Sequence, residues 1–431
     1  MSAARATEAS YDVIVIGGGP AGSTVGTLLA QHGRRTLIIE KSRFPRFHIG
    51  ESLMPETYWT FERLGMLPKL HRSHFVKKYS VQFVNASGKE SAPFYFDEMN
   101  PHECSQTWQV LRSEFDQMML DNAAEHGAHV WQGVSVSDVI FEEDGAHGRP
   151  RAAGVVATRE DGARVELRAR VVVDATGTQA LLSNKLGIRQ ADPSLRKAAV
   201  FAHYRGAYRD PGPRDEGATL VLHVKDQNGW FWYIPLPDDV VSVGVVGDID
   251  YLIKGRARPE QILIEEIERC PFLQPRLARA ERVSPAHVLS DYSYGATRCA
   301  GDGWVLIGDA FTFLDPIYSS GVFLALKSGE LAADAIHAAL AAGDVSAARL
   351  GGWGDAFYSG VQNIRKLVYA FYTKGFSFGQ FNREHPEQKR NLVNLLIGDV
   401  FQPERATIFD TMRRYCELPE SLALESGDRA G

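Results

Sequence analysis

Cysteine is scarce in this chain of 431 residues, and the few cysteines that it has stand far apart. They form neither a Cys-x-x-Cys pair nor a cluster with histidine, so a disulfide framework and a structural zinc site are both unsupported. We therefore expect no metal site and four reduced, buried thiols: Cys104, Cys270, Cys299 and Cys416.

Long hydrophobic runs and a strong excess of one charge are also missing. No run approaches the roughly 18 apolar residues of a membrane helix, and no apolar signal segment precedes the first strand. Lys and Arg number 47 against 53 Asp and Glu, a net charge of −6, which argues against a nucleic-acid binder that depends on a global basic field. We expect a cytoplasmic protein with neither a membrane nor nucleic acid as partner.

The composition is that of a large folded protein. Hydrophobic residues make up 44% and charged residues 23% of the chain, which is enough apolar material for a large core and too much for a disordered chain. Because the length is about three times that of a typical domain, we expect two or three interlocking domains.

An early segment has the pattern of a dinucleotide-binding βαβ unit. An apolar strand, Tyr11 to Ile16, runs into the glycine-rich turn from Gly17 to Gly22, and Ser23 to His32 then has small and apolar residues at helical spacing. A second β-branched strand, Thr36 to Ile39, ends at Glu40. The order of strand, turn, helix and strand is that of the Rossmann fingerprint.

Each glycine of this fingerprint has a separate role. Gly17 permits the tight turn, Gly19 lets the backbone approach a pyrophosphate, and Gly22 allows close packing of the helix, whose N-terminus offers amide N–H groups. Glu40 is placed to accept hydrogen bonds from a ribose diol. A glycine turn without a ligand is the alternative, and this motif alone leaves FAD and NAD both open.

The rest of the chain divides by pattern. Ala198 to Val246 is rich in β-branched and aromatic residues, with a turn at Asp226 to Gly229, and predicts a mostly antiparallel sheet. Helical patterns run from Leu324 to about Tyr415. We predict an α/β fold in which a Rossmann-like domain is interleaved with a β-sheet substrate domain. The expected ranges are 10–75, 105–185 and 285–345 for the nucleotide-binding domain, 76–104 and 186–284 for the substrate domain, and 346–431 for C-terminal helices.

A strand that ends in Gly308-Asp309-Ala310 completes a resemblance to the FAD-dependent two-domain monooxygenase superfamily. Trp230-Phe231-Trp232-Tyr233-Ile234-Pro235 resembles the Trp-x-Trp-x-Ile-Pro signature of the flavin-dependent halogenases, and Asp315-Pro316-Ile317-Tyr318-Ser319-Ser320-Gly321 resembles their halide-site loop. The match extends through Phe44-Pro45-Arg46 to Gly50-Glu51-Ser52-Leu53. Within the family, the chain looks most like the branch that acts on phenols or pyrroles, often tethered to a carrier protein.

The resemblance implies an enzyme that uses reduced FAD, O₂ and chloride or bromide to make hypohalous acid and to halogenate an electron-rich aromatic substrate, free or on an acyl or peptidyl carrier protein. Because the sequence has a single dinucleotide fingerprint, we expect a separate flavin reductase to supply reduced FAD. The implied FAD-binding residues are Gly17, Gly19, Pro20, Ala21, Gly22, Glu40, Lys41, Ser52, Arg112, Gly308, Asp309, Pro316 and Gly321. An i,i+4 pair with Asp116 is an equally ordinary role for Arg112.

Two further features of the family are a halide cradle and a shield for the flavin. Ser319, Ser320 and Gly321 open a predicted helix, whose amides and dipole could hold an anion; an ordinary helix cap is the alternative. The resemblance places the residues of the shield near the flavin, where they keep the substrate from the oxidant. An ordinary aromatic pair in the core is the alternative. The shield comprises Trp230, Trp232, Ile234 and Pro235.

Lys78 is the candidate catalytic residue, by resemblance to the halogenase lysine. Strand periodicity from Phe75 to Phe83 puts Lys77 with Tyr79, Val81 and Phe83, and Lys78 with Ser80 and Gln82 on the other face. One lysine at most can therefore point into a shared tunnel. Burial would lower the pKa of Lys78, whereas two solvated strand lysines are the alternative.

Tyr318 is a departure from part of the family. Members that halogenate free tryptophan carry a Glu at this place, and a tyrosine cannot replace a carboxylate at neutral pH. Free tryptophan is therefore disfavoured, and a phenol or pyrrole fits better. Two other functions stay open: an aromatic hydroxylase of the same fold that reduces its own FAD with NADPH, and a non-catalytic FAD-binding protein.

Residues 361–415 carry a local excess of positive charge. They contain nine Lys or Arg against five Asp or Glu, a net +4 in a protein of −6. Such a patch could dock an acidic carrier protein, and a solvated helical face is the alternative.

Overall fold

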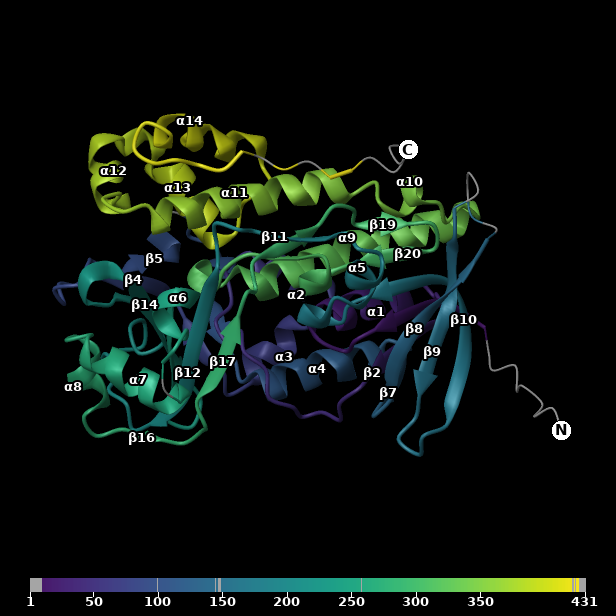
Figure 1. Cartoon of the computed structure of the whole chain (residues 1–431), viewed down its shortest axis with the longest axis horizontal. Coiled ribbons are helices and arrows are strands. Elements are labelled where there is room, and N and C mark those ends of the chain that lie inside the picture. Colours follow the sequence, from purple (N-terminus) through teal and green to yellow (C-terminus); the bar gives the residue numbers. More distant parts are fainter. Residues whose placement is uncertain are drawn as a thin grey trace.

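The computed structural model describes residues 10–98, 100–143, 145, 149–256, 258–420, 422 and 424–425. Figure 1 shows sheets at opposite ends of an elongated molecule, with the C-terminal helices along one long side. The predicted α/β fold, a Rossmann-like unit with a separate and mostly antiparallel sheet, is confirmed.

The first sheet grows from the predicted βαβ unit. Its order is β19-β20-β10-β1-β2-β7, and β1 pairs in parallel with β2 and β10. An antiparallel ribbon of β8 and β9 extends from β10. Strand β1 is apolar on both faces, which suits the centre of a parallel sheet, where both faces are covered. The strands are β1 (Tyr11–Ile16), β2 (Thr36–Glu40), β7 (His129–Gln132), β8 (Ser135–Glu142), β9 (Arg151–Thr158), β10 (Arg164–Asp174), β19 (Ala300–Gly301) and β20 (Trp304–Leu306).

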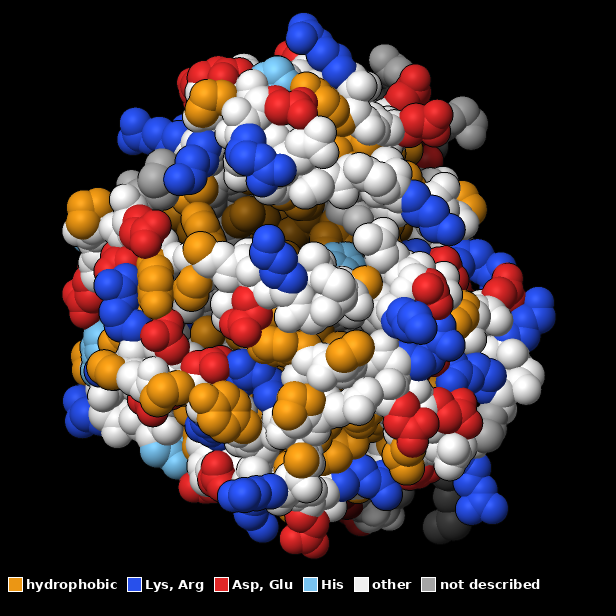
Figure 2. Space-filling model, turned by 90° about the vertical axis from the view of Figure 1, so that its left-hand side faces the viewer, with side chains coloured by type: hydrophobic (Ala, Val, Ile, Leu, Met, Phe, Trp, Pro, Cys, Tyr) orange, Lys and Arg blue, Asp and Glu red, His pale blue; other side chains and the backbone are white. Residues whose placement is uncertain are grey.

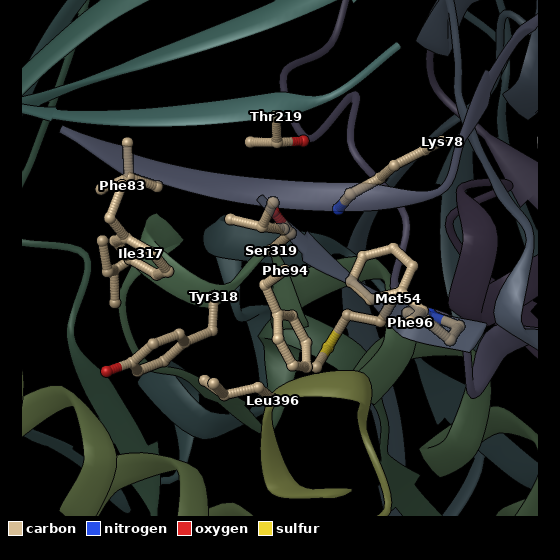
Figure 3. A pocket seen from close by; sticks show the side chains of 13 residues that line it. Met54, Lys78, Phe83, Phe94, Phe96, Thr219, Ile317, Tyr318, Ser319 and Leu396 are labelled. Atoms are coloured by element: carbon tan, nitrogen blue, oxygen red, sulfur yellow. The ribbon is translucent and has the colours of Figure 1, made fainter. Parts of the chain in front are cut away.

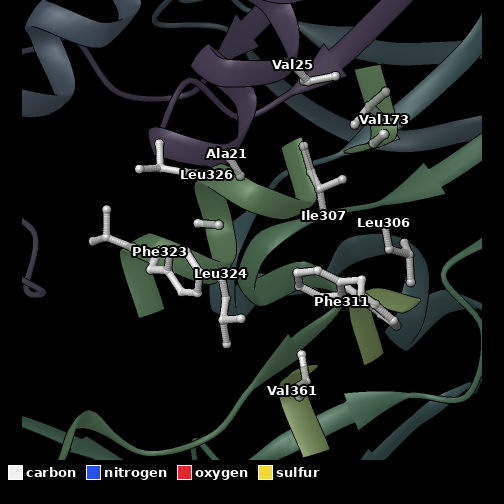
Figure 4. Packing of buried hydrophobic residues seen from close by; sticks show 14 of the residues in the cluster. Ala21, Val25, Val173, Leu306, Ile307, Phe311, Phe323, Leu324, Leu326 and Val361 are labelled. Atoms are coloured by element: carbon white, nitrogen blue, oxygen red, sulfur yellow. The ribbon is translucent and has the colours of Figure 1, made fainter. Parts of the chain in front are cut away.

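Helix α1 (Pro20–Gln31) packs between two other helices, α4 (Arg112–Glu125) and α9 (Ser320–Ala342). Its many small residues permit this close approach. Figure 4 shows Ala21 of α1 beside the long helix α9, whose other side faces Val361 of α11 (Gly354–Tyr372). One apolar cluster therefore joins the Rossmann unit to the C-terminal helices.

The second sheet is mostly antiparallel, as its β-branched and aromatic sequence predicts. Its order is β16-β12-β15-β14-β13-β4-β5, with β17 also paired to β12, and its β13–β4 pair is parallel. β17 begins at residue 287, beyond the limit of 284 predicted for this sheet. The strands are β4 (Ser80–Val84), β5 (Phe94–Tyr95), β12 (Lys197–Arg205), β13 (Thr219–His223), β14 (Gly229–Leu236), β15 (Val240–Asp248), β16 (Glu281–Arg282) and β17 (His287–Ser290).

The segment from Phe75 to Phe83 is not the single strand that its periodicity predicts. β3 (Val76–Lys78) pairs with β6 (Thr107–Gln109), whereas β4 belongs to the second sheet. Tyr79 separates the two strands, so the alternation of faces does not carry across it. This break lets Lys78 share a cavity with Val81 and Phe83, the face that strict alternation would assign to Lys77.

The remaining elements connect and cover the sheets. A small sheet is formed by β11 (Arg189–Ala191), β18 (Tyr294–Ala296) and β21 (Thr312–Phe313). The shorter helices within the sheet regions are α2 (Thr57–Arg63), α3 (Leu67–Arg72), α5 (Leu181–Lys185), α6 (Ile249–Leu252), α7 (Pro259–Glu268) and α8 (Leu273–Leu277). The C-terminal region adds, besides α11, α10 (Ala347–Leu350), α12 (Phe378–Glu384), α13 (Lys389–Ile397) and α14 (Ile408–Met412).

The four cysteines are free and buried. Within the described part of the chain, no helix is long and apolar enough to cross a membrane. No group of three or more His, Cys, Asp or Glu residues in that part is placed to hold a metal ion.

Candidate active site

The fingerprint loop has room for a ligand at Gly19 and not at Gly17 or Gly22. Gly17 has a φ of +108°, and a Cβ there would overlap the carbonyl oxygen of Ala175. A Cβ at Gly22 would overlap the carbonyl oxygen of Gly17, so the fold itself requires both glycines. A Cβ at Gly19 would meet only Arg46 Nη2, at 3.5 Å, among the described atoms. This open space fits the pyrophosphate of FAD.

Glu40 lies at the end of β2, where it orders the fingerprint loop. Its Oε2 accepts a hydrogen bond from Gly18 N and its Oε1 accepts one from Ser42 N, both at 2.8 Å. Each carboxylate oxygen can accept a second hydrogen bond, so the predicted contact to a ribose hydroxyl remains compatible with this geometry. The neighbouring Lys41 is exposed, and its Nζ donates to Gln179 Oε1 at 3.2 Å.

Two arginines beside the fingerprint share the buried carboxylate of Asp116. Arg112 donates to both of its oxygens, at 2.7 and 3.0 Å, so the predicted i,i+4 pair is present. Arg46 Nη1 lies 3.0 Å from Asp116 Oδ2. This places the Arg46 guanidinium next to Gly19, where it could meet a pyrophosphate. The sequence analysis noted Arg46 as part of a matching segment and did not single it out as a ligand.

The second fingerprint segment packs directly on the first. Gly308 follows β20, and a Cβ there would approach Ala21 Cβ to 2.9 Å. Burial raises the pKa of the next residue, Asp309, to about 7, and the charge of Arg112 opposes that shift. The two segments predicted to bind FAD therefore meet at the start of α1.

Asp315 anchors the predicted halide-site loop to a distant helix. Its Oδ1 accepts from Ile317 N at 3.0 Å, which closes the turn η7 (Pro316–Tyr318). Its Oδ2 accepts from the hydroxyl of Tyr372, the last residue of α11, at 3.0 Å. Trp230 Nε1 in turn donates to the Tyr372 oxygen at 2.9 Å. A chain of hydrogen bonds thus joins the Trp-x-Trp segment, α11 and the loop.

The loop then turns into α9 through Ser319. Ser319 has a φ of +57° and makes no side-chain cap hydrogen bond, so the serine cap considered from sequence is not formed there. Ser320 is buried at the first position of α9, followed by Gly321. Tyr318 turns away: its hydroxyl donates to the carbonyl of Leu367 in α11 at 3.0 Å.

The residues of the Trp-x-Trp segment face one side of β14, as predicted. Trp230, Trp232 and Ile234 belong to the apolar cluster that includes the Rossmann core, whereas Phe231 and Tyr233 belong to the cluster on the other face of the sheet. The two indole rings lie 6.3 Å apart between centroids. All of these side chains are buried, and so is Pro235.

A small, partly open cavity brings several predicted residues together (Figure 3). Lys78 and Ser319 both line it, and most of the other lining side chains are apolar. No carboxylate or histidine is among the residues that line it within the described part of the chain. The lining is Met54, Pro55, Lys78, Val81, Phe83, Phe94, Phe96, Thr219, Val221, Ile317, Tyr318, Ser319 and Leu396.

Lys78 and Lys77 differ sharply in their surroundings. Lys77 is exposed, whereas Lys78 is 2% exposed, and burial lowers the pKa of its ammonium to about 7. Lys78 Nζ donates to Ser52 Oγ at 2.8 Å and to the carbonyl of Leu53 at 3.1 Å. Ser52, which the resemblance implied as an FAD ligand, thus contacts the lysine. The Phe96 ring lies 5.5 Å from Nζ.

An apolar hollow opens on the same side of the molecule. Figure 2 shows it floored with hydrophobic side chains, with Lys and Arg at its rim, on the face where α12 and α13 lie in Figure 1. Residues of β4, β5 and α13, which lie at this end of the molecule in Figure 1, line the cavity described above.

Known proteins resemble this chain over nearly its whole length. The family described as FAD binding domain matches residues 10–344. A chlorinase of 1H-pyrrole-2-carbonyl groups on a peptidyl-carrier protein, from Pseudomonas fluorescens, is 33% identical over 95% of this chain and 94% of its own. A brominase of the same description, from Pseudoalteromonas luteoviolacea, is 35% identical over 92% and 93%. The chain belongs to the flavin-dependent halogenases.

Solved structures of other flavin-dependent halogenases have the same fold as this halogenase. The brominase Bmp2 has a TM-score of 0.84 at 33% identity, over 94% of this chain and 99% of its own. The myxobacterial chondrochloren halogenase CndH has a TM-score of 0.77 at 32% identity, over 92% of each chain. These relatives favour the halogenase over the aromatic hydroxylase and the non-catalytic flavoprotein.

Three residues near the sites of this halogenase were missed as site residues by sequence reasoning: Arg46, Thr219 and Tyr372. Arg46 had a signal, since it ends the Phe44-Pro45-Arg46 segment. Thr219 and Tyr372 had none, because each reaches its place through a strand or helix far away in the sequence.

Replacing Gly19 by valine is expected to abolish FAD binding while the protein stays folded. The φ of −68° at Gly19 is open to any residue, and a Cβ added there would have space in the protein. The valine side chain would therefore collide only with the pyrophosphate. Gly22→Val is the control, and it should prevent folding. Flavin absorbance after purification measures binding, and circular dichroism measures folding. A yellow Gly19→Val protein with stoichiometric FAD would contradict the placement of the cofactor.

Tyr372→Phe is expected to lower the free energy of unfolding by about 1–3 kcal/mol, because Trp230 Nε1 and Asp315 Oδ2 lose a buried partner. Burial raises the pKa of Asp315 to about 6, and loss of the donor raises it further. A carboxyl whose pKa is raised in the folded state makes the protein less stable as the pH increases through that pKa. The loss of unfolding free energy in Tyr372→Phe should therefore be larger at pH 8 than at pH 5.

Tyr369→Phe is the matched control for that experiment. It lies on the same helix and donates to Asp192 at 2.7 Å, but Asp192 also keeps an ion pair with Arg365 at 2.9 Å. Urea unfolding at pH 5 and pH 8 measures the free energy of unfolding of wild type and of both variants. An equal loss for both variants, independent of pH, would show that Tyr372 does not stabilise ionised Asp315.

Proposed function

We propose that this halogenase chlorinates or brominates an electron-rich ring of the pyrrole type, held on a carrier protein. The observation that carries the proposal is the mostly apolar cavity that Lys78 and Ser319 line together. The similarity to chlorinases and brominases of carrier-bound pyrrole-2-carbonyl groups supports the choice of substrate.

The cofactor is FAD, and the residues present fit it. Gly19 leaves space for the pyrophosphate, Arg46 supplies a cation, and Glu40 supplies an acceptor near the ribose. When bound and reduced, FAD supplies with O₂ the oxidant that turns halide into hypohalous acid. A separate flavin reductase provides the reduced FAD in this proposal, because the sequence has one dinucleotide fingerprint.

The backbone at the start of α9 holds the halide. Amide N–H groups at the N-terminus of a helix have no intrahelical acceptor, and the helix dipole adds positive potential there. Ser319, Ser320 and Gly321 occupy this position, and the Ser319 side chain does not cap it. The Asp315 turn and the Tyr318 hydroxyl fix the loop from the opposite side.

Lys78 activates hypohalous acid at the substrate end of the cavity. Two of its N–H groups are directed to Ser52 Oγ and to the Leu53 carbonyl, and the third is free to donate into the cavity. A pKa of about 7 lets the lysine donate a proton near neutral pH. Trp230 and Trp232 are buried in the apolar cluster that includes the Rossmann core, and the family resemblance gives them the role of a shield for the flavin.

The substrate supplies its own electron density. Tyr318 occupies the place of the Glu found in tryptophan halogenases, and its hydroxyl is committed to Leu367. A ring that needs a carboxylate beside it would therefore find none among the described lining residues. A pyrrole or phenol reacts without that help.

A positively charged surface next to the hollow suits a carrier protein. Three of the nine Lys and Arg side chains in residues 361–415 form ion pairs: Arg365 with Asp192, Arg405 with Asp399 and Arg413 with Asp410. Lys366 is buried over Phe409. The exposed cations that pair with no carboxylate of the described residues are Lys374, Arg383, Lys389, Arg390 and Arg414.

Chloride or bromide is expected to give a saturable change in the absorbance spectrum of the FAD complex. An anion held by the amides of Ser319 to Gly321 would sit beside the flavin and alter its field. Acetate at equal ionic strength is the control. Identical titration curves for bromide, chloride and acetate would contradict the halide site.

Lys78→Ala is expected to keep FAD and O₂ consumption and to lose halogenated product by at least about 10²-fold, the usual worth of a general acid. Lys77→Ala, the neighbouring exposed lysine, should behave as wild type. Product is measured by mass spectrometry with chemically reduced FAD, O₂ and bromide, using a pyrrole substrate both free and carrier-tethered.

Three outcomes of this experiment count against the proposal. Loss of product in Lys77→Ala and not in Lys78→Ala would move the catalytic role to the other lysine. Hydroxylated product without halogenated product from wild type, with rapid bleaching of bound FAD by NADPH, would indicate the hydroxylase. Absence of O₂ consumption with any reduced flavin would indicate a non-catalytic protein.

A further inference from the structure

Lys78 is the end of a buried chain of hydroxyl groups. Its Nζ lies 2.8 Å from Ser52 Oγ, and Ser52 Oγ lies 3.1 Å from Thr219 Oγ1. Both hydroxyl side chains are buried, and Thr219 also lines the cavity. In Figure 3 the hydroxyl of Thr219 faces the side from which Lys78 enters. The lysine therefore reaches the cavity by its own third N–H and, through Ser52, by the Thr219 hydroxyl.

Gln109 fixes the direction of this chain. Its Nε2 donates to the carbonyl of Gly217 at 3.0 Å and to Thr219 Oγ1 at 2.8 Å. A carbonyl oxygen can only accept, so the amide orientation is determined, and Thr219 must accept from Gln109. The hydroxyl hydrogen of Thr219 is then left for Ser52 or for the cavity.

The protonation state of Lys78 decides between these two directions. A charged lysine donates to Ser52, which passes its own hydrogen to Thr219, and the Thr219 hydrogen turns into the cavity. A neutral lysine has a lone pair, so the hydrogens point the other way, from Thr219 to Ser52 and from Ser52 to Nζ. The pKa of about 7 makes both states accessible near neutral pH.

Halogenation of a ring moves two protons. One goes to the hydroxide part of hypohalous acid, which leaves as water when the ring carbon bonds to the halogen. The other leaves the same ring carbon and restores the aromatic system. The cavity offers no carboxylate or histidine for the second proton among its described lining residues, and the Tyr318 hydroxyl is committed to Leu367.

We propose that Thr219 accepts this second proton and passes it to Lys78 through Ser52. Lys78 first gives a proton to the departing hydroxide and becomes neutral, which turns the hydroxyl chain toward Nζ. The ring proton then binds Thr219 Oγ1, the Thr219 hydrogen moves to Ser52, and the Ser52 hydrogen moves to Nζ. The lysine is again charged, so the cycle balances without a further base. This inference rests on the proposed function.

The test is Thr219→Val, which keeps the side-chain shape and removes the hydroxyl. Halogenated product is expected to form about 10²-fold more slowly, while FAD binding and O₂ consumption stay unchanged. Because loss of the ring proton becomes rate-limiting, a substrate deuterated at its ring carbons should react more slowly than the protonated one in this variant and not in wild type. Thr219→Ser, which keeps the hydroxyl, should restore both properties.

Thr107→Val is the matched control. Thr107 is buried on β6 opposite Lys78, donates to the Met54 carbonyl at 3.4 Å, and does not line the cavity. It should halogenate like wild type without an isotope effect. A wild-type rate and no isotope effect in Thr219→Val would overturn the relay, and so would an equal loss in Thr107→Val.

A measurement on the resting protein separates the relay from the proposed function. Ser52→Ala removes an acceptor that favours the charged amine, so the pKa of Lys78 should fall, as measured by the ¹³Cε shift of labelled lysine during a pH titration. Lys78→Arg identifies the signal, and Thr107→Val should leave it unchanged. An unchanged pKa in Ser52→Ala would overturn the coupling even if wild type halogenates. A wild type that makes no halogenated product, with the pKa shifted as expected, would overturn the proposed function alone.

Discussion

The site depends on one ammonium group that the fold has withdrawn from water. A buried lysine is tolerated only when oxygen atoms receive its N–H groups, and Lys78 finds them in Ser52 Oγ and the Leu53 carbonyl. Both acceptors lie in the segment that follows the βαβ unit, whereas Lys78 is the last residue of β3, just before the chain enters the second sheet. Strand β6 brings them together, because it pairs with β3 and its Gln109 forms an isolated bridge with Ser52.

The C-terminal helices complete the site from the other side. In helix α11, the Leu367 carbonyl accepts a hydrogen bond from the Tyr318 hydroxyl, and the Tyr372 hydroxyl donates one to Asp315. These two hydrogen bonds fix the loop that turns into α9. Leu396 of α13 also forms part of the cavity wall. The region with the least diagnostic sequence thus sets the position of the most diagnostic loop. It contributes a carbonyl, a hydroxyl and apolar surface, and none of these has a distinctive sequence pattern.

Sequence reasoning worked where the chemistry is local. The βαβ unit and the shared face of Trp230 and Trp232 follow from residue spacing, and the structure has both. The preference for Lys78 over Lys77 came from resemblance together with strand alternation, and the difference in burial agrees, although the assumed single strand does not exist. Thr219 could not be found, because its proposed role arises from a β13–β4 pairing and from contacts to residues more than a hundred positions away.

The described residues that line the cavity include no carboxylate, which bears on the charge of Lys78 and on the proposed halide site. A Glu in place of Tyr318 would stabilise the ammonium of Lys78 and raise its pKa, which would hold the lysine charged at neutral pH. The same negative charge would oppose a halide at the start of α9. With tyrosine there, no carboxylate among the described lining residues opposes the proposed halide site or holds Lys78 charged, and burial keeps the pKa of the lysine at about 7. A lysine with a pKa near neutral pH can both give and recover a proton, and the proposed reaction of a ring activated by its own electrons requires this property.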